Sequence, residues 1–80
     1  MDLREAATLA RQQITDLFAG DTPQNVRLET FLYDDHLMVW SLTIGFALSS
    51  RAGSSEPQLR SYKVVRVSEA NKSVLSVSDP

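Results

Sequence analysis

Hydrophobic positions change their period along the chain, from a helical spacing near the N-terminus to an alternating spacing over the remainder. From about residue 3 to residue 19, apolar residues recur at intervals of three and four, which predicts an amphipathic helix. The apolar stripe consists of Leu3, Ala6, Ala7, Ala10, Ile14, Leu17 and Phe18. Asp2 stands where an N-cap is expected, and Glu5 follows three residues later. Gly20 is expected to end the helix in a left-handed conformation, and Pro23 prevents its continuation.

Alternating apolar and polar residues predict four strands, at about residues 26–33, 37–49, 59–68 and 74–78. The second run is the strongest, because its even positions are all apolar and mostly large: Met38, Trp40, Leu42, Ile44, Phe46 and Leu48. We expect this face to pack on the helix, with Trp40 buried and structural, facing Ala10, Ile14 and Leu17. The chain is therefore predicted to be one α+β domain, with an N-terminal helix packed on a curled antiparallel meander of about four strands.

The connections between the strands carry further expectations about the sheet. Matching the apolar faces of the first two strands requires a hairpin loop of odd length, most simply Asp34-Asp35-His36. The length of the second strand and its internal Gly45 favour a bend or bulge at that glycine. Residues 50–58 are expected to form a connection without internal structure. The last hairpin should turn over residues 69–72, with Asn71 in a left-handed conformation.

The alternation leaves apolar residues on both faces of the predicted sheet. If Val65, Val67, Leu75 and Val77 face the helix, the other apolar residues face away from it. The residues expected on this second face are Phe31, Tyr33, Leu37, Val39, Tyr62, Val64 and Val74. One helix cannot cover both faces, and a second apolar face on a small domain is typical of an interface, so a homodimer or another protein partner is expected. Scattered exposed apolar residues are the alternative interpretation.

Composition supports a single folded domain of ordinary polarity. The chain has 80 residues, of which 42% are apolar and 22% charged. A domain of this length buries a limited share of its surface, which favours a core shared with a partner. The absence of cysteine excludes disulfides and thiolate metal sites. No basic segment followed by an apolar stretch opens the sequence, so a cytoplasmic location without membrane association is expected.

Charge is unevenly distributed between the two parts of the chain. Residues 1–50 carry three cationic and seven anionic side chains, whereas residues 51–80 carry five cationic and three anionic ones. We expect these opposite charges to meet within the fold or across a dimer. The alternative is an anionic ligand or nucleic acid bound along Arg60, Lys63 and Arg66, with Arg60 and Arg66 on one face and Lys63 on the other. A net charge of −2 argues against nucleic acid.

Asp34, Asp35 and His36 form the only cluster with residue types suited to catalysis. A small hydrolase or isomerase using this turn is an alternative function, but adjacent side chains in a tight turn rarely converge on one atom. The sequence has no second histidine, no nucleophile elbow and no glycine-rich phosphate loop. We therefore predict no catalytic, metal or cofactor site, and a non-enzymatic interaction or regulatory module.

The order of the elements also resembles a known family. A short alanine-rich helix, a strand, a long strand carrying Trp40, and a closing hairpin built from residues 62–67 and 73–77 resemble small PepSY-type modules and, more widely, cystatin-like folds. The resemblance implies a helix on a curled antiparallel sheet. It also implies a binding role.

Overall fold

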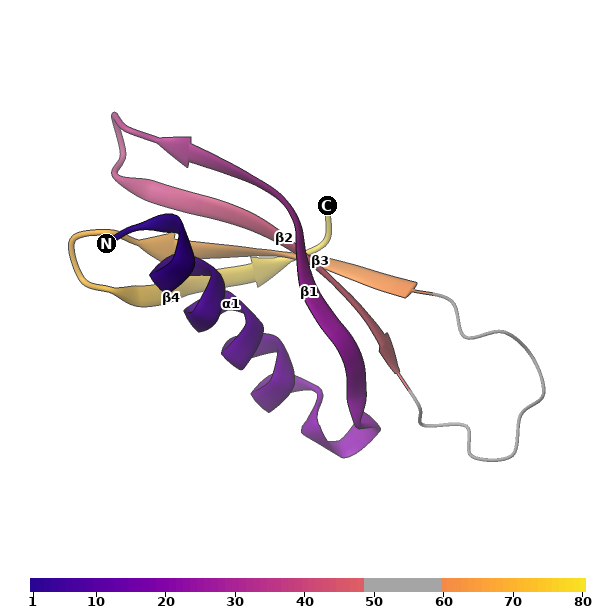
Figure 1. Ribbon diagram of the computed structural model, residues 1–80. Coiled ribbons are helices and arrows are strands. Elements are labelled where there is room, and N and C mark those ends of the chain that lie inside the picture. Colours follow the sequence, from indigo (N-terminus) through magenta and orange to yellow (C-terminus); the bar gives the residue numbers. More distant parts are fainter. Residues whose placement is uncertain (49–59) are drawn as a thin grey trace, which may run out of the picture.

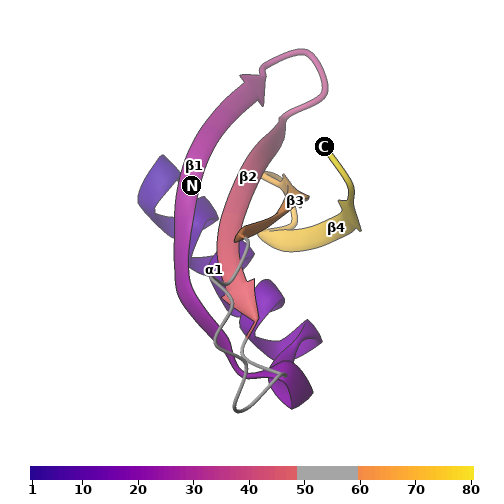
Figure 2. The same cartoon turned by 90° about the vertical axis from the view of Figure 1, so that its right-hand side faces the viewer.

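The computed structural model describes residues 1–48 and 60–80, which form one helical layer and one antiparallel sheet, the predicted α+β fold. The elements in order are α1 (Leu3–Leu17), the 3-10 helix η1 (Ala19–Asp21), β1 (Pro23–Asp34), β2 (Val39–Leu48), β3 (Arg60–Ser68) and β4 (Ser73–Ser78). The strand order β1-β2-β3-β4 makes the sheet a meander, and α1 lies across one of its faces (Figure 1). Figure 2 shows how strongly the sheet curls. The predicted connection at residues 50–58 lies outside the described residues.

The start of α1 follows the sequence prediction, and its end differs. The backbone N–H of Glu5 donates to Asp2 Oδ1 at 2.9 Å, which confirms the N-cap. At the other end, α1 stops at Leu17 and η1 continues the chain, with hydrogen bonds from the Asp21 N–H to the Phe18 carbonyl and from the Thr22 N–H to the Ala19 carbonyl. The left-handed residue is Thr22, with φ 48°, so the prediction for Gly20 was wrong. Pro23 then begins β1, three residues before the predicted start.

The core lies between α1 and the inner two strands. Its buried residues are Ala6, Ala7, Ala10 and Ile14 from α1, Leu42, Ile44 and Phe46 from β2, and Val65 and Val67 from β3. The rings of Phe18 and Phe46 lie 5.0 Å apart, which fixes the C-terminal end of α1 at the Phe46 end of β2. Trp40 packs against the other end of the core and is only partly buried. Leu17 is 54% exposed, so it does not face Trp40 as expected.

The irregularities of the sheet lie in its outer strands. Pairing between β2 and β3 runs without a register shift from Val39 to Ala47, so β2 has no bulge at Gly45, one of the two irregularities predicted there. Instead, β1 has one extra residue between Gln24 and Arg27 and a second at Glu29. A third lies in β4, at Leu75. Outer strands accept such bulges readily because they are paired on one side only, and bulges increase the local twist.

Gly45 has a different role, which is to leave room for an ion pair. A Cβ atom at this position would lie 2.4 Å from Glu29 Oε1 and 2.8 Å from Arg60 Nη2. These two groups are 3.1 Å apart and lie over the glycine, so the ion pair connects β1 to β3 across β2. Only a residue without a side chain allows this close approach.

The hairpin between β1 and β2 turns over four residues instead of the predicted three. Asp34 pairs with Val39, and residues 35–38 form the turn. Asp34 Oδ1 accepts hydrogen bonds from the backbone N–H groups of His36 and Leu37, both at 3.0 Å. The bulge at Glu29 changes the pairing parity between Leu28 and the turn, which is why the loop length is even. In the last hairpin the turn does cover residues 69–72, but Lys72, with φ 52°, is the left-handed residue there.

Candidate interaction surface

The face of the sheet opposite α1, called the open face below, carries several large apolar side chains. Directly paired residues of antiparallel strands point to the same side, so the register assigns each residue to a face. Leu32, Val39, Tyr62 and Val64 belong to the open face by this register. The bulged residue Leu75 has no partner in the register, and it belongs to the open face because it lines a hollow there together with Val39 and Arg66. Leu37 joins them from the hairpin turn. The exposed fractions are 70% for Leu32, 66% for Leu37, 53% for Leu75 and 44% for Tyr62.

Three of the predicted interface residues lie on the other face. Phe31 pairs with Leu42 and Tyr33 with Trp40, which places both on the α1 side. The bulge at Glu29 shifts the alternation of β1 by one residue, so Leu32 takes the open face instead. In β4 the bulge at Leu75 has the same effect, since Val74 pairs with Val67 and packs against the core.

The four remaining predicted residues, Leu37, Val39, Tyr62 and Val64, do lie on the open face. Sequence reasoning missed Leu32 and Leu75 because an inserted residue leaves the hydrophobic pattern looking regular. Asn25 is the one local signal of a bulge in β1. It adopts φ 53°, and asparagine enters this left-handed region more readily than most residues.

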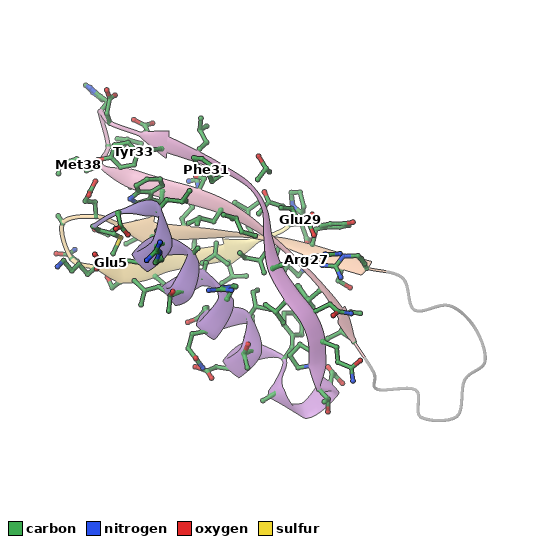
Figure 3. All side chains as sticks on the ribbon, viewed as in Figure 1. Glu5, Arg27, Glu29, Phe31, Tyr33 and Met38 are labelled. Carbon is green, nitrogen blue, oxygen red and sulfur yellow. The ribbon has the colours of Figure 1, made fainter. Side chains whose placement is uncertain are left out.

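The aromatic residues on the α1 side form a cluster at the hairpin end of β1 and β2. The ring of Tyr33 lies 4.6 Å from that of Trp40, and the ring of Phe31 lies 6.3 Å from it. Figure 3 shows Phe31, Tyr33 and Met38 at this end of the molecule. The Tyr33 hydroxyl donates a hydrogen bond to Glu69, and this bond, together with desolvation and nearby carboxylates, raises the pKa of Tyr33 to about 12.

Glu69 connects this cluster to the N-terminus of the chain. The hydrogen bond from Tyr33, and then that from the terminal amino group, lower the pKa of the Glu69 carboxyl below its usual value. The Met1 nitrogen lies 3.2 Å from Glu69 Oε1. The carboxylate thus ties the hairpin, the β3–β4 turn and the start of α1 together, which is a structural role.

Two hollows lie at the surface, and one of them is on the open face. It has a volume of about 190 Å³ and is lined by Asp34, Leu37, Val39, Ser41, Arg66, Leu75 and Ser76. The other, of about 400 Å³, lies beside the first turns of α1 and is lined by Met1, Arg4, Glu5, Thr8, Leu9 and Lys72. The open-face hollow combines apolar side chains with one cation and one anion.

The predicted anion-binding residues are mostly engaged within the chain. Arg60 donates to the Asn25 carbonyl at 3.0 Å and to Glu29 at 3.1 Å. Lys63 forms an ion pair with Asp79, on the side of the sheet opposite to Arg60 and Arg66, as predicted. Arg66 is exposed and forms no ion pair with any residue that the structure describes. A continuous basic surface along β3 therefore does not form.

In the acidic hairpin turn, the Asp34 side chain stabilises the backbone conformation. Asp34 uses Oδ1 to hold the turn amides, which is the ordinary function of aspartate at such a position. Within residues 1–48 and 60–80, no group of three or more histidine, aspartate or glutamate side chains is arranged to hold a metal ion. The arrangement at Asp34, Asp35 and His36 thus supplies turn geometry, and nothing in it assembles a set of reacting groups.

In the described parts of the chain, no helix has the length and apolar character needed to cross a membrane. Comparison of the chain with protein-family models, with curated proteins and with solved structures found no match.

Proposed function

We propose that this protein is a non-enzymatic interaction module that forms a homodimer through the open face. The observation that carries the proposal is the set of large apolar side chains left in solvent on this face, led by Leu32 at 70% exposure. Monomeric soluble proteins rarely keep a large contiguous apolar surface exposed, and those that do generally use it for binding. A regulatory role through another protein partner is consistent with the same surface.

A second sheet is a good physical match for this face. Sheets that pack face to face bury the side chains of their inner faces in a layer about 10 Å thick. Dimerisation would give the open face the cover that α1 gives the other face. An interface of standard size needs about 800 Å² from each partner, and a four-stranded face can provide an area of this order.

The alternative functions have less support. An anionic ligand or a nucleic acid on β3 would have to compete with the ion pairs of Arg60 and Lys63. A small enzyme built on Asp34, Asp35 and His36 would have to release Asp34 from the hydrogen bonds that form the turn.

Sedimentation velocity over a range of protein concentrations tests the proposal. We expect the wild-type chain to shift from monomer to dimer as concentration rises, and Leu75→Lys to remain monomeric, because a buried ammonium group opposes the interface. Leu17→Lys is the matched control, since Leu17 is exposed to nearly the same extent, 54% against 53%, but lies on α1. A wild-type chain that stays monomeric at every concentration, or equal effects of the two variants, would contradict the proposal.

A further inference from the structure

The open face carries two opposite charges that have no charged partner among the residues that the structure describes. Arg66 is exposed and forms no ion pair with residues 1–48 or 60–80. Asp34 is also exposed, and it bonds only to backbone amides of its own turn. Both side chains line the same hollow of about 190 Å³. Two complementary charges thus lie close together on an apolar surface.

The sheet keeps these charges apart within the monomer. Asp34 is paired with Val39 on one side of β2, and Arg66 is paired with Ser41 on the other. Because neighbouring strands are spaced by about 4.8 Å, the two backbones are about 10 Å or more apart. Between them lie Val39 and Ser41. No ion pair joins them among the described residues, so both charges remain available to a second copy.

We infer that the partner of the open face is a second copy of this chain, placed so that Asp34 of each copy pairs with Arg66 of the other. This inference rests on the proposed function and adds the register of the dimer to it. In a two-fold interface, if residue i contacts residue j, then j also contacts i. A two-fold axis that lies between the two sheets and parallel to them, perpendicular to the line from Asp34 to Arg66 and level with its midpoint, forms both pairs at once.

The same placement arranges the apolar residues favourably. Val39 lies near the midpoint between the charges, so it comes close to the axis and meets its own copy. Leu37 and Leu75, which line the hollow, surround this centre. An apolar centre with ion pairs toward the rim is the usual arrangement of a specific interface, in which the charges fix orientation and exclude wrong pairings.

Charge reversal at the two positions gives a direct test by sedimentation equilibrium. Arg66→Asp alone places acids opposite acids across the axis, and Asp34→Arg alone places cations opposite cations. We expect each variant alone to dimerise at least about tenfold more weakly than the wild-type chain, since two favourable pairs become repulsive. An equimolar mixture of the two variants restores both pairs, so it should form a heterodimer within about threefold of the wild-type Kd.

Two further measurements keep the test independent of folding. The Arg66 side chain forms no ion pair with residues 1–48 or 60–80 of its own copy, so Arg66→Asp should keep the thermal midpoint of the monomer. Its weak self-association should strengthen with added salt, which screens the repulsion, while that of the wild-type chain should weaken. Arg11→Asp, which reverses an exposed arginine on α1, is the charge control and should leave the dimer unchanged.

The outcomes separate this inference from the proposed function. If Leu75→Lys abolishes the dimer while Arg66→Asp leaves both its Kd and its salt dependence unchanged, the open face is the interface and the inferred register is overturned. If the mixture associates no better than either variant alone although both are folded, the pairing is overturned as well. A wild-type chain that never dimerises removes both proposals.

Discussion

At the scale of single residues, one glycine of the sheet has a role although its backbone conformation is ordinary. Gly45 is needed because the carboxylate of Glu29 and the guanidinium of Arg60 occupy the space where a side chain would begin. The sequence pointed to this glycine as an irregularity of β2. The glycine is required by Glu29 and Arg60, which are distant from it in sequence, so the local hydrophobic pattern could not reveal its role.

Gly45→Ala should lower the free energy of unfolding by about 1–3 kcal/mol, because the new methyl group displaces the Glu29–Arg60 pair. Urea denaturation measures this loss. The control is Gly20→Ala, where no atom lies within 4 Å of the new methyl group and the stability should change by less than about 0.5 kcal/mol. In a Glu29→Ala background the cost of Gly45→Ala should fall. An equal cost in both backgrounds would show that the ion pair is not the obstacle.

Tyr33 supplies a residue-scale prediction about pH. Tyr62→Phe leaves Tyr33 as the only tyrosine, so its absorbance change on ionisation can be followed alone. We expect a titration midpoint near 12, and a clear decrease in Tyr62→Phe/Glu69→Gln, because the carboxylate that holds the phenol protonated is gone. The folded-state pKa is raised, so the stabilisation is complete below the unfolded value of 10 and is lost as pH rises toward 12. An unchanged midpoint in the double variant would contradict the assigned cause.

The stabilisation contributed by Glu69 changes with pH in the opposite direction to that of Tyr33, and it does so in acid. Its folded-state pKa lies below the ordinary value of 4.5, so its stabilisation is present above that value and is lost as pH falls through the lowered pKa. Glu69→Gln should therefore be less stable than the wild-type chain at neutral pH, and the difference should narrow in acid. Thermal midpoints recorded from pH 7 to pH 2.5 would show this. A difference that stays constant over the range would assign the effect of the substitution to something other than ionisation.

At the scale of the elements, the helix and the centres of the strands follow from sequence, whereas the faces of the outer strands do not. The stripe of α1 and the alternation of β2 are local periodicities, and both were confirmed in their central parts, although Leu17 and Met38 at their ends are exposed. A bulge is decided by pairing with the neighbouring strand, so an extra residue such as Glu29 or Leu75 leaves no mark in the pattern. The bulges therefore place Phe31, Tyr33 and Val74 on the face opposite to the predicted one. They also bring Leu32 and Leu75 to the open face, which the sequence pattern did not indicate.

Trp40 belongs to this scale because it joins the β1–β2 hairpin to the end of the core. Trp40→Ala should cost about 2–3 kcal/mol, at or below the lower end for fully buried aromatic residues, since the ring is only partly buried. Phe31→Ala, which removes a ring that is 49% exposed in the same cluster, should cost less than about 1 kcal/mol. Urea denaturation of both variants checks the order. If Phe31→Ala lost more free energy of unfolding than Trp40→Ala, the Phe31 ring would contribute more than Trp40 to the packing of this cluster.

At the scale of the whole molecule, one helix and one curled sheet make an elongated particle with extents of 46 × 19 × 19 Å. Such a shape leaves much of its surface in water, and a two-layer domain of this size has little stability to spare. If the open face is covered by a second copy, folding and association are thermodynamically linked. The stability of the chain then depends on its concentration.

The thermal midpoint of the wild-type chain should therefore rise with protein concentration, whereas that of Leu75→Lys should stay constant. Calorimetric scans over a hundredfold range of concentration test this. Leu17→Lys should behave as the wild-type chain does. Midpoints that are independent of concentration in all three proteins would show that the folded monomer gains nothing from self-association.

The bulges described in β1 and β4 also affect how far an assembly of this protein can grow. The strands at the two ends of a sheet present free backbone groups, and these can recruit further chains side by side without limit, as in fibres. Here both end strands are interrupted, β1 twice and β4 once, while the inner strands are regular. Lateral polymerisation is thereby opposed along both borders. If two copies pair through the open face, as proposed, that contact closes after two copies, and the architecture then favours a finite pair over an open-ended aggregate.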